Sequence, residues 1–120
     1  MRRVTIVIVL AGTLAACGGG GPETSGDVHQ GPGGPDAVKV TMEDVRFGPD
    51  SLELPAGSTV EIELTNDGDQ AHNFTIEDLD VSSGTVDPGE VVTVTFSVPD
   101  GTTTFVCTFH PGMDGEIVAT

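Results

Sequence analysis

Alternation between apolar and polar residues runs through the chain from residue 37 onward and restricts it to a β fold. In residues 58–65, for example, the apolar side chains of Val60, Ile62 and Leu64 alternate with carboxylates. A period of two places successive side chains on opposite faces, so such a segment forms a strand with one buried face. The same pattern predicts strands over residues 37–42, 73–76, 90–98, 102–107 and 116–119.

Turn-forming residues separate the predicted strands. Pro-Ala-Gly at 55–57, Asp-Pro-Gly at 87–89 and Pro-Asp-Gly at 99–101 supply the backbone angles that tight turns need. Short strands joined by such turns predict an all-β fold, an antiparallel sandwich or barrel, over residues 37–120. In the strand 90–98 the side chains of Thr93, Thr95 and Ser97 are predicted to lie on the face opposite the apolar side chains.

The first sixteen residues are expected to direct export. Arg2 and Arg3 precede the apolar run Val4–Ala11, which is too short to cross a bilayer as a mature helix. The sequence Leu14-Ala15-Ala16-Cys17 resembles a bacterial lipobox, in which the cysteine is lipidated and becomes the new N-terminus. This resemblance predicts a signal peptide over 1–16 and an exported, lipid-anchored protein on the periplasmic or cell-surface side of the cell membrane. An ordinary signal peptide, with Cys17 incidental, is the alternative.

Residues 17–36 are rich in glycine, proline and polar residues and are expected to form a flexible tether behind the lipidated cysteine. A flexible chain of this length has a typical span of about 25 Å. The tether contains His29, which is expected to be solvated rather than bound to a metal.

Acidic residues dominate the charge of the chain. Nineteen Asp and Glu oppose four Lys and Arg, and the net charge is −15. Removal of a signal peptide that holds Arg2 and Arg3 makes the mature chain more negative still. Such a surface disfavours nucleic acid and anionic surfaces as partners, and it favours a protein with a basic docking surface.

The few soft side chains of the predicted domain occur at metal-ligand spacing. With Cys17 assigned to lipid, Cys107 is a single thiol in an oxidising compartment, where it needs protection or a function. It begins a C-x2-H-x2-M pattern with His110 and Met113. Two His, one Cys and a weak axial Met describe a blue-copper site, and outside the tether only His72 can be the second His. Each residue taken singly could instead be structural, and zinc also accepts His and Cys, although the spaced Met favours copper.

Residues 37–120 resemble a cupredoxin, most closely amicyanin and plastocyanin-like bacterial domains. The resemblance rests on His72-Asn73-Phe74 and on Cys107-Thr108-Phe109-His110-Pro111-Gly112-Met113. It implies a Greek-key β-sandwich, one type 1 copper ion that cycles between Cu(I) and Cu(II), and electron transfer. By position, His72, Cys107 and His110 would be the strong ligands and Met113 the axial ligand. Asn73 would tie the ligand loops together.

The resemblance also argues against an enzyme. Copper oxidases and nitrite reductases of this superfamily place a His beside the Cys, whereas Cys107 lies between Val106 and Thr108. We therefore expect a membrane-tethered electron carrier with a redox protein as partner. A copper-binding carrier or delivery protein with no electron-transfer role is the alternative, and a metal-free sandwich is a third possibility. The nearby acids Asp69, Asp114 and Glu116 are expected to favour Cu(II) and to lower the reduction potential.

Overall fold

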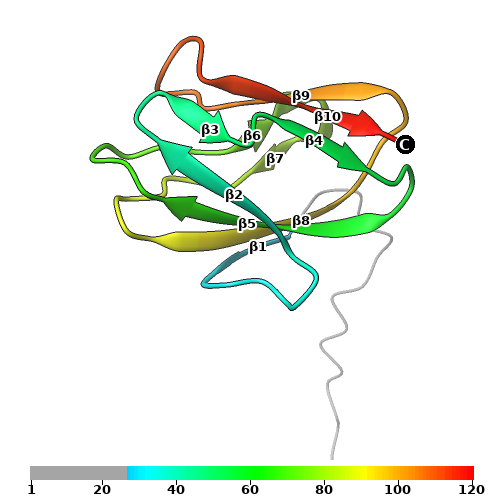
Figure 1. The fold of residues 1–120 in the computed structure, drawn as a ribbon, viewed down its shortest axis with the longest axis horizontal. Helices are drawn as coiled ribbons and strands as arrows, with labels where there is room; N and C mark the ends of the chain where they lie inside the picture. The colour runs from blue at the N-terminus through cyan, green and yellow to red at the C-terminus, as the bar shows by residue number, and fades with distance from the viewer. Residues whose placement is uncertain (1–26) are drawn as a thin grey trace, which may run out of the picture.

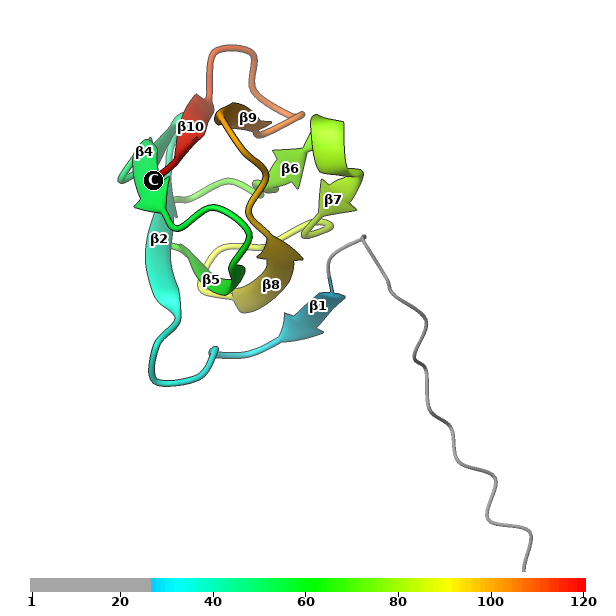
Figure 2. The ribbon, with the colours of Figure 1, turned by 90° about the vertical axis from the view of Figure 1, so that its right-hand side faces the viewer.

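Two five-stranded sheets pack face to face in the computed structural model, which describes residues 27–120 (Figure 1). One sheet has the strand order β1 (Asp27–Gln30), β8 (Val91–Ser97), β5 (Thr59–Asn66), β2 (Val38–Glu43) and β3 (Arg46–Gly48). The other has the order β4 (Ser51–Leu54), β10 (Asp114–Ala119), β9 (Thr102–Val106), β6 (Thr75–Ile76) and β7 (Val81–Ser82). A single 3-10 turn, η1 (Glu77–Leu79), joins β6 to β7. The predicted all-β sandwich is confirmed, and Figure 2 shows its two layers nearly end on.

The predicted signal peptide (1–16), the predicted lipid site Cys17 and the tether as far as residue 26 lie outside the described residues. Within residues 27–120, no helix has both the length and the apolar character needed to span a bilayer.

The strands predicted from alternation are all present, but the pairing is mixed. Most neighbours are antiparallel, whereas β2 pairs with β5 and β4 with β10 in parallel. Parallel neighbours cannot be joined by a tight hairpin. The chain therefore reaches β5 from β2 only after β3 and after β4, which lies in the opposite sheet. The alternation within a single strand does not reveal that the chain crosses to the opposite sheet at β4. Strand β3 also occupies positions 47 and 48, although Phe47-Gly48-Pro49-Asp50 has the composition of a turn.

The last ten residues of the predicted tether belong to the sandwich, and the expectation of a flexible tether as far as residue 36 needs this correction. Strand β1 pairs antiparallel with β8, with Asp27 opposite Thr95 (Figure 2). The hydroxyl of Thr93 donates to the carbonyl of Gly31 at 2.8 Å, and Thr93 is fully buried. The edge of β8 would otherwise expose unpaired backbone groups, and β1 satisfies them.

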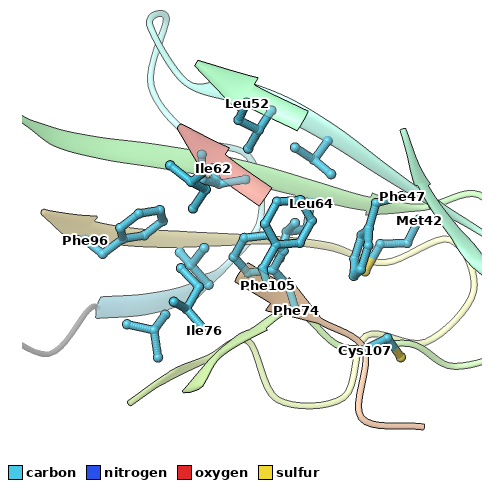
Figure 3. Packing of buried hydrophobic residues seen from close by; sticks show 14 of the residues in the cluster. Met42, Phe47, Leu52, Ile62, Leu64, Phe74, Ile76, Phe96, Phe105 and Cys107 are labelled. Atoms are coloured by element: carbon cyan, nitrogen blue, oxygen red, sulfur yellow. The ribbon is translucent and has the colours of Figure 1, made fainter. Parts of the chain in front are cut away.

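Aromatic packing fills the core near the C-terminal end of β9. The ring centroids of Phe74 and Phe105 lie 4.7 Å apart, and Phe47 meets Phe105 edge-on at 5.0 Å (Figure 3). A Cβ atom at Gly115 would overlap the Phe105 ring and lie 2.5 Å from the carbonyl oxygen of Asp50. Only glycine fits there, so β10 lies close against this cluster. Cys107, one residue past β9, belongs to this buried cluster.

Candidate metal centre

Three connections meet at one end of the sandwich, at the left of Figure 1. They are the β2–β3 turn, the segment between β5 and β6, and the loop between β9 and β10. The C-terminus lies at the opposite end. Residues far apart in the sequence are therefore brought together here by the order of the strands.

The loop between β9 and β10 is closed by its own backbone. Pro111 and Gly112 occupy the centre of a turn in which the amide of Met113 donates to the carbonyl of His110 at 3.1 Å. Gly112 has φ +89°, and proline followed by a glycine with positive φ is the pattern of a type II turn. The amide of Cys107 donates to the carbonyl of Met113 at 2.9 Å, which closes the base of the loop. The C-x2-H-x2-M spacing thus wraps one compact turn.

His72 reaches the same place from the segment between β5 and β6. Its backbone forms a bridge with Val86, with hydrogen bonds of 3.1 and 2.8 Å. The buried amide of Asn66 supports this segment by donating to the carbonyls of Gln70 and Val86 at 2.7 and 2.8 Å. His72 itself is fully buried, and both nitrogens of its ring lack a hydrogen-bond partner.

The side chains of His72, Cys107 and His110 form one cluster. One ligand atom from each lies within 4.8 Å of the others, and the two imidazole rings are 4.9 Å apart between centroids. No second group of this kind occurs within residues 27–120. A buried imidazole without a hydrogen bond is costly, and an ion shared with the neighbouring sulfur and imidazole would satisfy it. Sulfur and imidazole are also the donors that copper prefers, so the residues present fit a copper ion.

Asn73 joins the two ligand-bearing segments, as predicted. Its Nδ2 donates to Oγ1 of Thr108 at 2.7 Å, and its Oδ1 accepts the backbone amide of Thr108 at 3.0 Å. The backbone amide of Asn73 also points to the sulfur of Cys107 at 3.4 Å. This contact holds the sulfur beside the segment that carries His72.

Burial keeps His72 in the protonation state that a metal ligand needs. Desolvation lowers the pKa of His72 below its ordinary value, and the nearby His110 lowers it further, while Asp44 opposes both. The imidazole therefore stays neutral to lower pH than an exposed histidine does, with a lone pair available for an ion.

The remaining predicted residues occupy different positions. Met113 is buried at the base of the loop, so its thioether is held inside, and its role as the axial ligand stays a prediction. His110 is partly exposed and Phe109 is 47% exposed, so this loop forms the surface of the centre. His29 lies on exposed β1, outside the cluster.

Two residues that contact the centre were missed by the sequence reasoning. Thr108 forms two hydrogen bonds with Asn73, one accepted by its hydroxyl and one donated by its backbone amide, and its position next to Cys107 was the only available signal. Asp44, at the β2–β3 turn, lies 3.6 Å from Nε2 of His72 through its Oδ1. Nothing in its local sequence connects Asp44 to a histidine so distant along the chain.

Replacing Asn73 by Ala should loosen the centre. The substitution leaves the amide of Thr108 without its acceptor and should lower the free energy of unfolding by about 1–3 kcal/mol. It should also speed release of bound copper to a chelator. Thr108→Val removes only the Oγ1 acceptor and should have a smaller effect on both. Chemical denaturation and stopped-flow chelation measure the two quantities, and wild-type values for Asn73→Ala would contradict this role.

Comparisons with known proteins agree with the fold. A family model described as a cupredoxin-like domain matches residues 6–119. Among solved structures, auracyanin from Roseiflexus castenholzii is 21% identical over 73% of this chain and 99% of its own, with a TM-score of 0.61. Amicyanin from Paracoccus versutus is 20% identical over 72% of this chain and 84% of its own, with a TM-score of 0.59. A purple cupredoxin from Nitrosopumilus maritimus is 22% identical over 69% and 99%, with a TM-score of 0.57.

None of the curated proteins compared with the chain matches it. At the identities given above, the solved structures establish likeness of fold, and membership of the family rests on the family model. That model spans nearly the whole chain, and the sandwich brings two histidines and a cysteine together in one cluster. The chain therefore belongs to the cupredoxin-like family of electron-transfer copper proteins, with copper as its cofactor.

Proposed function

We propose that this protein is a membrane-tethered, extracytoplasmic type 1 copper protein that passes single electrons between redox partners. The observation that carries the proposal is the cluster of His72, Cys107 and His110, whose ligand atoms lie within 4.8 Å of one another. Met113 would complete the set as the axial ligand. A copper ion bound here supplies a one-electron couple between Cu(I) and Cu(II). The packed core beneath Cys107 and the bonds of Asn73 hold the ligands in place, so little has to rearrange when an electron arrives or leaves.

Electrons would cross at the β9–β10 loop. His110 is partly exposed there, while His72 and Cys107 are buried. Phe109 adds an exposed apolar side chain beside His110. An apolar contact of this kind lets a partner approach the His110 ring without leaving water between the two proteins.

The charge distribution supports a partner with a basic docking surface. A shallow surface hollow begins directly after the metal loop, and the carboxylates of Asp50, Asp114 and Glu116 line it. The chain as a whole carries a net charge of −15. Such a field attracts a cationic protein to this end and raises the rate of encounter.

The course of β1 supports attachment through the N-terminus. Asp27 pairs with Thr95, in the second half of β8, whereas Gln30 pairs with Val92, close to the end where the metal centre lies. The chain therefore enters β1 from the side farther from the centre. An anchor at Cys17 would hold the domain at the membrane while the metal loop remains free to meet a partner.

We also propose that the protein has no catalytic activity of its own. Cupredoxin homologues are electron carriers rather than enzymes. Cys107 is flanked by Val106 and Thr108, so no histidine beside it leads to a second copper centre.

Copper loading and redox cycling test the function directly. The protein should bind one Cu(II) with intense visible absorption from the Cys107 thiolate, and one electron per protein should bleach this absorption reversibly. Cys107→Ser should remove the absorption. Electron exchange with a small redox mediator should also be faster than loss of copper to a chelator. Faster loss of copper would favour the delivery role, and failure to retain one copper per protein would favour a metal-free sandwich.

Salt dependence tests the proposed partner class. The rate constant for electron transfer to a cationic redox protein should fall as ionic strength rises, because the Debye length shrinks to about 8 Å at physiological salt. Asp114→Asn with Glu116→Gln should lower the rate at low salt and converge with the wild type at high salt. Stopped-flow kinetics measure these rates, and a rate that is independent of salt or rises with it would contradict a basic partner.

Replacing Cys17 by Ser tests the anchor. The wild-type protein should fractionate with membranes and carry the added mass of acyl chains, each methylene of which contributes about 0.8 kcal/mol to insertion. Cys17→Ser should lose that mass and should no longer be held by acyl chains. Unmodified Cys17 in the mature wild type, shown by mass spectrometry, would contradict the lipid anchor.

A further inference from the structure

An acidic side chain that plays no part in the ligand set lies against the buried histidine of the metal centre. Asp44 forms the tip of the turn between β2 and β3, and its Oδ1 lies 3.6 Å from Nε2 of His72. The same oxygen accepts the backbone amide of Asp69 at 2.9 Å. The carboxylate therefore sits between the β2–β3 turn and the segment that carries His72.

The surrounding backbone is built to let Asp44 approach this closely. A Cβ atom at Gly68 would overlap Oδ1 of Asp44 and lie 3.1 Å from its backbone nitrogen. The amide of Asp67 donates to the carbonyl of Met42 at 2.9 Å, which fastens the same segment to β2. Val45 follows Asp44 with φ +69°, a left-handed conformation that costs a β-branched residue about 1–3 kcal/mol. The fold maintains a strained turn at the point where it presents Asp44.

The position of Asp44 distinguishes the two nitrogens of the His72 ring. Nε2 is the atom near the carboxylate, and we therefore assign Nδ1 to the ion shared with Cys107 and His110. A metal bound through Nδ1 fixes the proton on Nε2 and makes that N–H a stronger donor. Metal-bound histidines commonly donate this second N–H to a carboxylate, which fixes the tautomer and orients the ring. The separation of 3.6 Å between Oδ1 of Asp44 and Nε2 of His72 is longer than a hydrogen bond. Metal binding through Nδ1 would place a proton on Nε2, and this N–H would donate to Asp44 at a shorter distance.

We propose that Asp44 is a positioning residue of the metal centre: its carboxylate accepts the N–H of His72 opposite the ligating nitrogen, orients the ring and favours Cu(II) over Cu(I). The inference rests on the copper centre proposed above and adds a residue to it. The preference for Cu(II) follows from charge, because a carboxylate beside the ring stabilises the more positive ion. The side chain of Asp44 is 40% exposed, so solvent weakens this effect without removing it.

Three variants separate orientation from charge. Asp44→Asn keeps an oxygen acceptor but loses the charge, whereas Asp44→Ala loses both. Asp114→Asn removes a charge at the same end of the sandwich, and among the described residues Asp114 has no ion pair or hydrogen bond with His72. If Asp44 acts on His72, removing it should weaken Cu(II) binding more than Cu(I) binding. Loss of a carboxylate behind a ligand typically lowers metal affinity about tenfold or more.

The test uses the full-length protein in detergent, loaded with copper. An affinity loss about tenfold greater for Cu(II) than for Cu(I) equals a rise of about 59 mV in reduction potential for one electron. Asp44→Ala should show a rise of this size, Asp44→Asn a smaller one, and Asp114→Asn the smallest. In the Cu(I) protein, nitrogen NMR should show a slowly exchanging N–H at Nε2 of His72 that Asp44→Ala loses and Asp44→Asn retains.

Different results would overturn the role of Asp44 and the copper centre itself. Equal shifts of the potential in Asp44→Ala and Asp114→Asn, with an unchanged N–H signal for His72, would overturn the role of Asp44 while leaving the centre intact. A wild-type protein that binds neither Cu(I) nor Cu(II) would overturn both. Denaturation of the metal-free variants shows whether Asp44→Ala only destabilises the turn, in which case Asp44→Asn still reports the effect of the charge.

Discussion

The structure depends on the burial of one imidazole that the protein does not satisfy. His72 has no exposed surface, and neither ring nitrogen has a hydrogen-bond partner. Leaving such a group unpaired costs about 1–3 kcal/mol, a large share of the stability of a domain this small. The sulfur of Cys107 and the ring of His110 lie close enough to share an ion with it. A metal that binds only the folded protein would satisfy the His72 imidazole and raise the free energy of unfolding.

The rest of the fold keeps those side chains in place. The stacked rings of Phe74 and Phe105 fill the core beside β9, and Gly115 lets β10 lie against them, so Cys107 leaves the sheet from a rigid base. Asn73 then links the His72 segment to the β9–β10 loop through Thr108. The turn at Pro111 and Gly112 returns the chain to β10 and closes the loop around His110. The centre is thus stiff at the buried ligands and open to the surface at His110.

The sequence alone predicted the strands and the grouping of His72, Cys107 and His110 well, for physical reasons that also explain what it missed. Alternation reports which face of a strand is buried, so strands such as β5 could be identified from their residues alone. It does not report which strand lies beside which, so the parallel pairs and the exchange of β4 between sheets were not predicted. The burial of Thr93 was not predicted, because nothing in its own strand reveals that residues 27–34 cover it.

The candidate site likewise contains residues that the sequence revealed and residues that only the fold revealed. Cys107, His110 and Met113 could be found because one short turn carries them, and His72 because it was the only other histidine in the predicted domain. Asp44 lies beside His72 but belongs to the β2–β3 turn, which is distant from His72 in the sequence. Its local sequence resembles any acidic turn. Contacts of this kind can be identified only once the fold is known. The N-terminal strand β1 is a further case, since four mostly polar residues become a strand only because β8 offers a free edge.

X-ray absorption of the copper-loaded protein is the sharpest test of this centre, because it reports the atoms bound to the metal in each oxidation state. We expect one short copper–sulfur distance and two imidazole nitrogens in the Cu(II) form, with the same ligands and small changes in distance in the Cu(I) form. A first shell without sulfur, or with a single imidazole, would show that His72, Cys107 and His110 do not hold one ion together and would contradict the proposed centre.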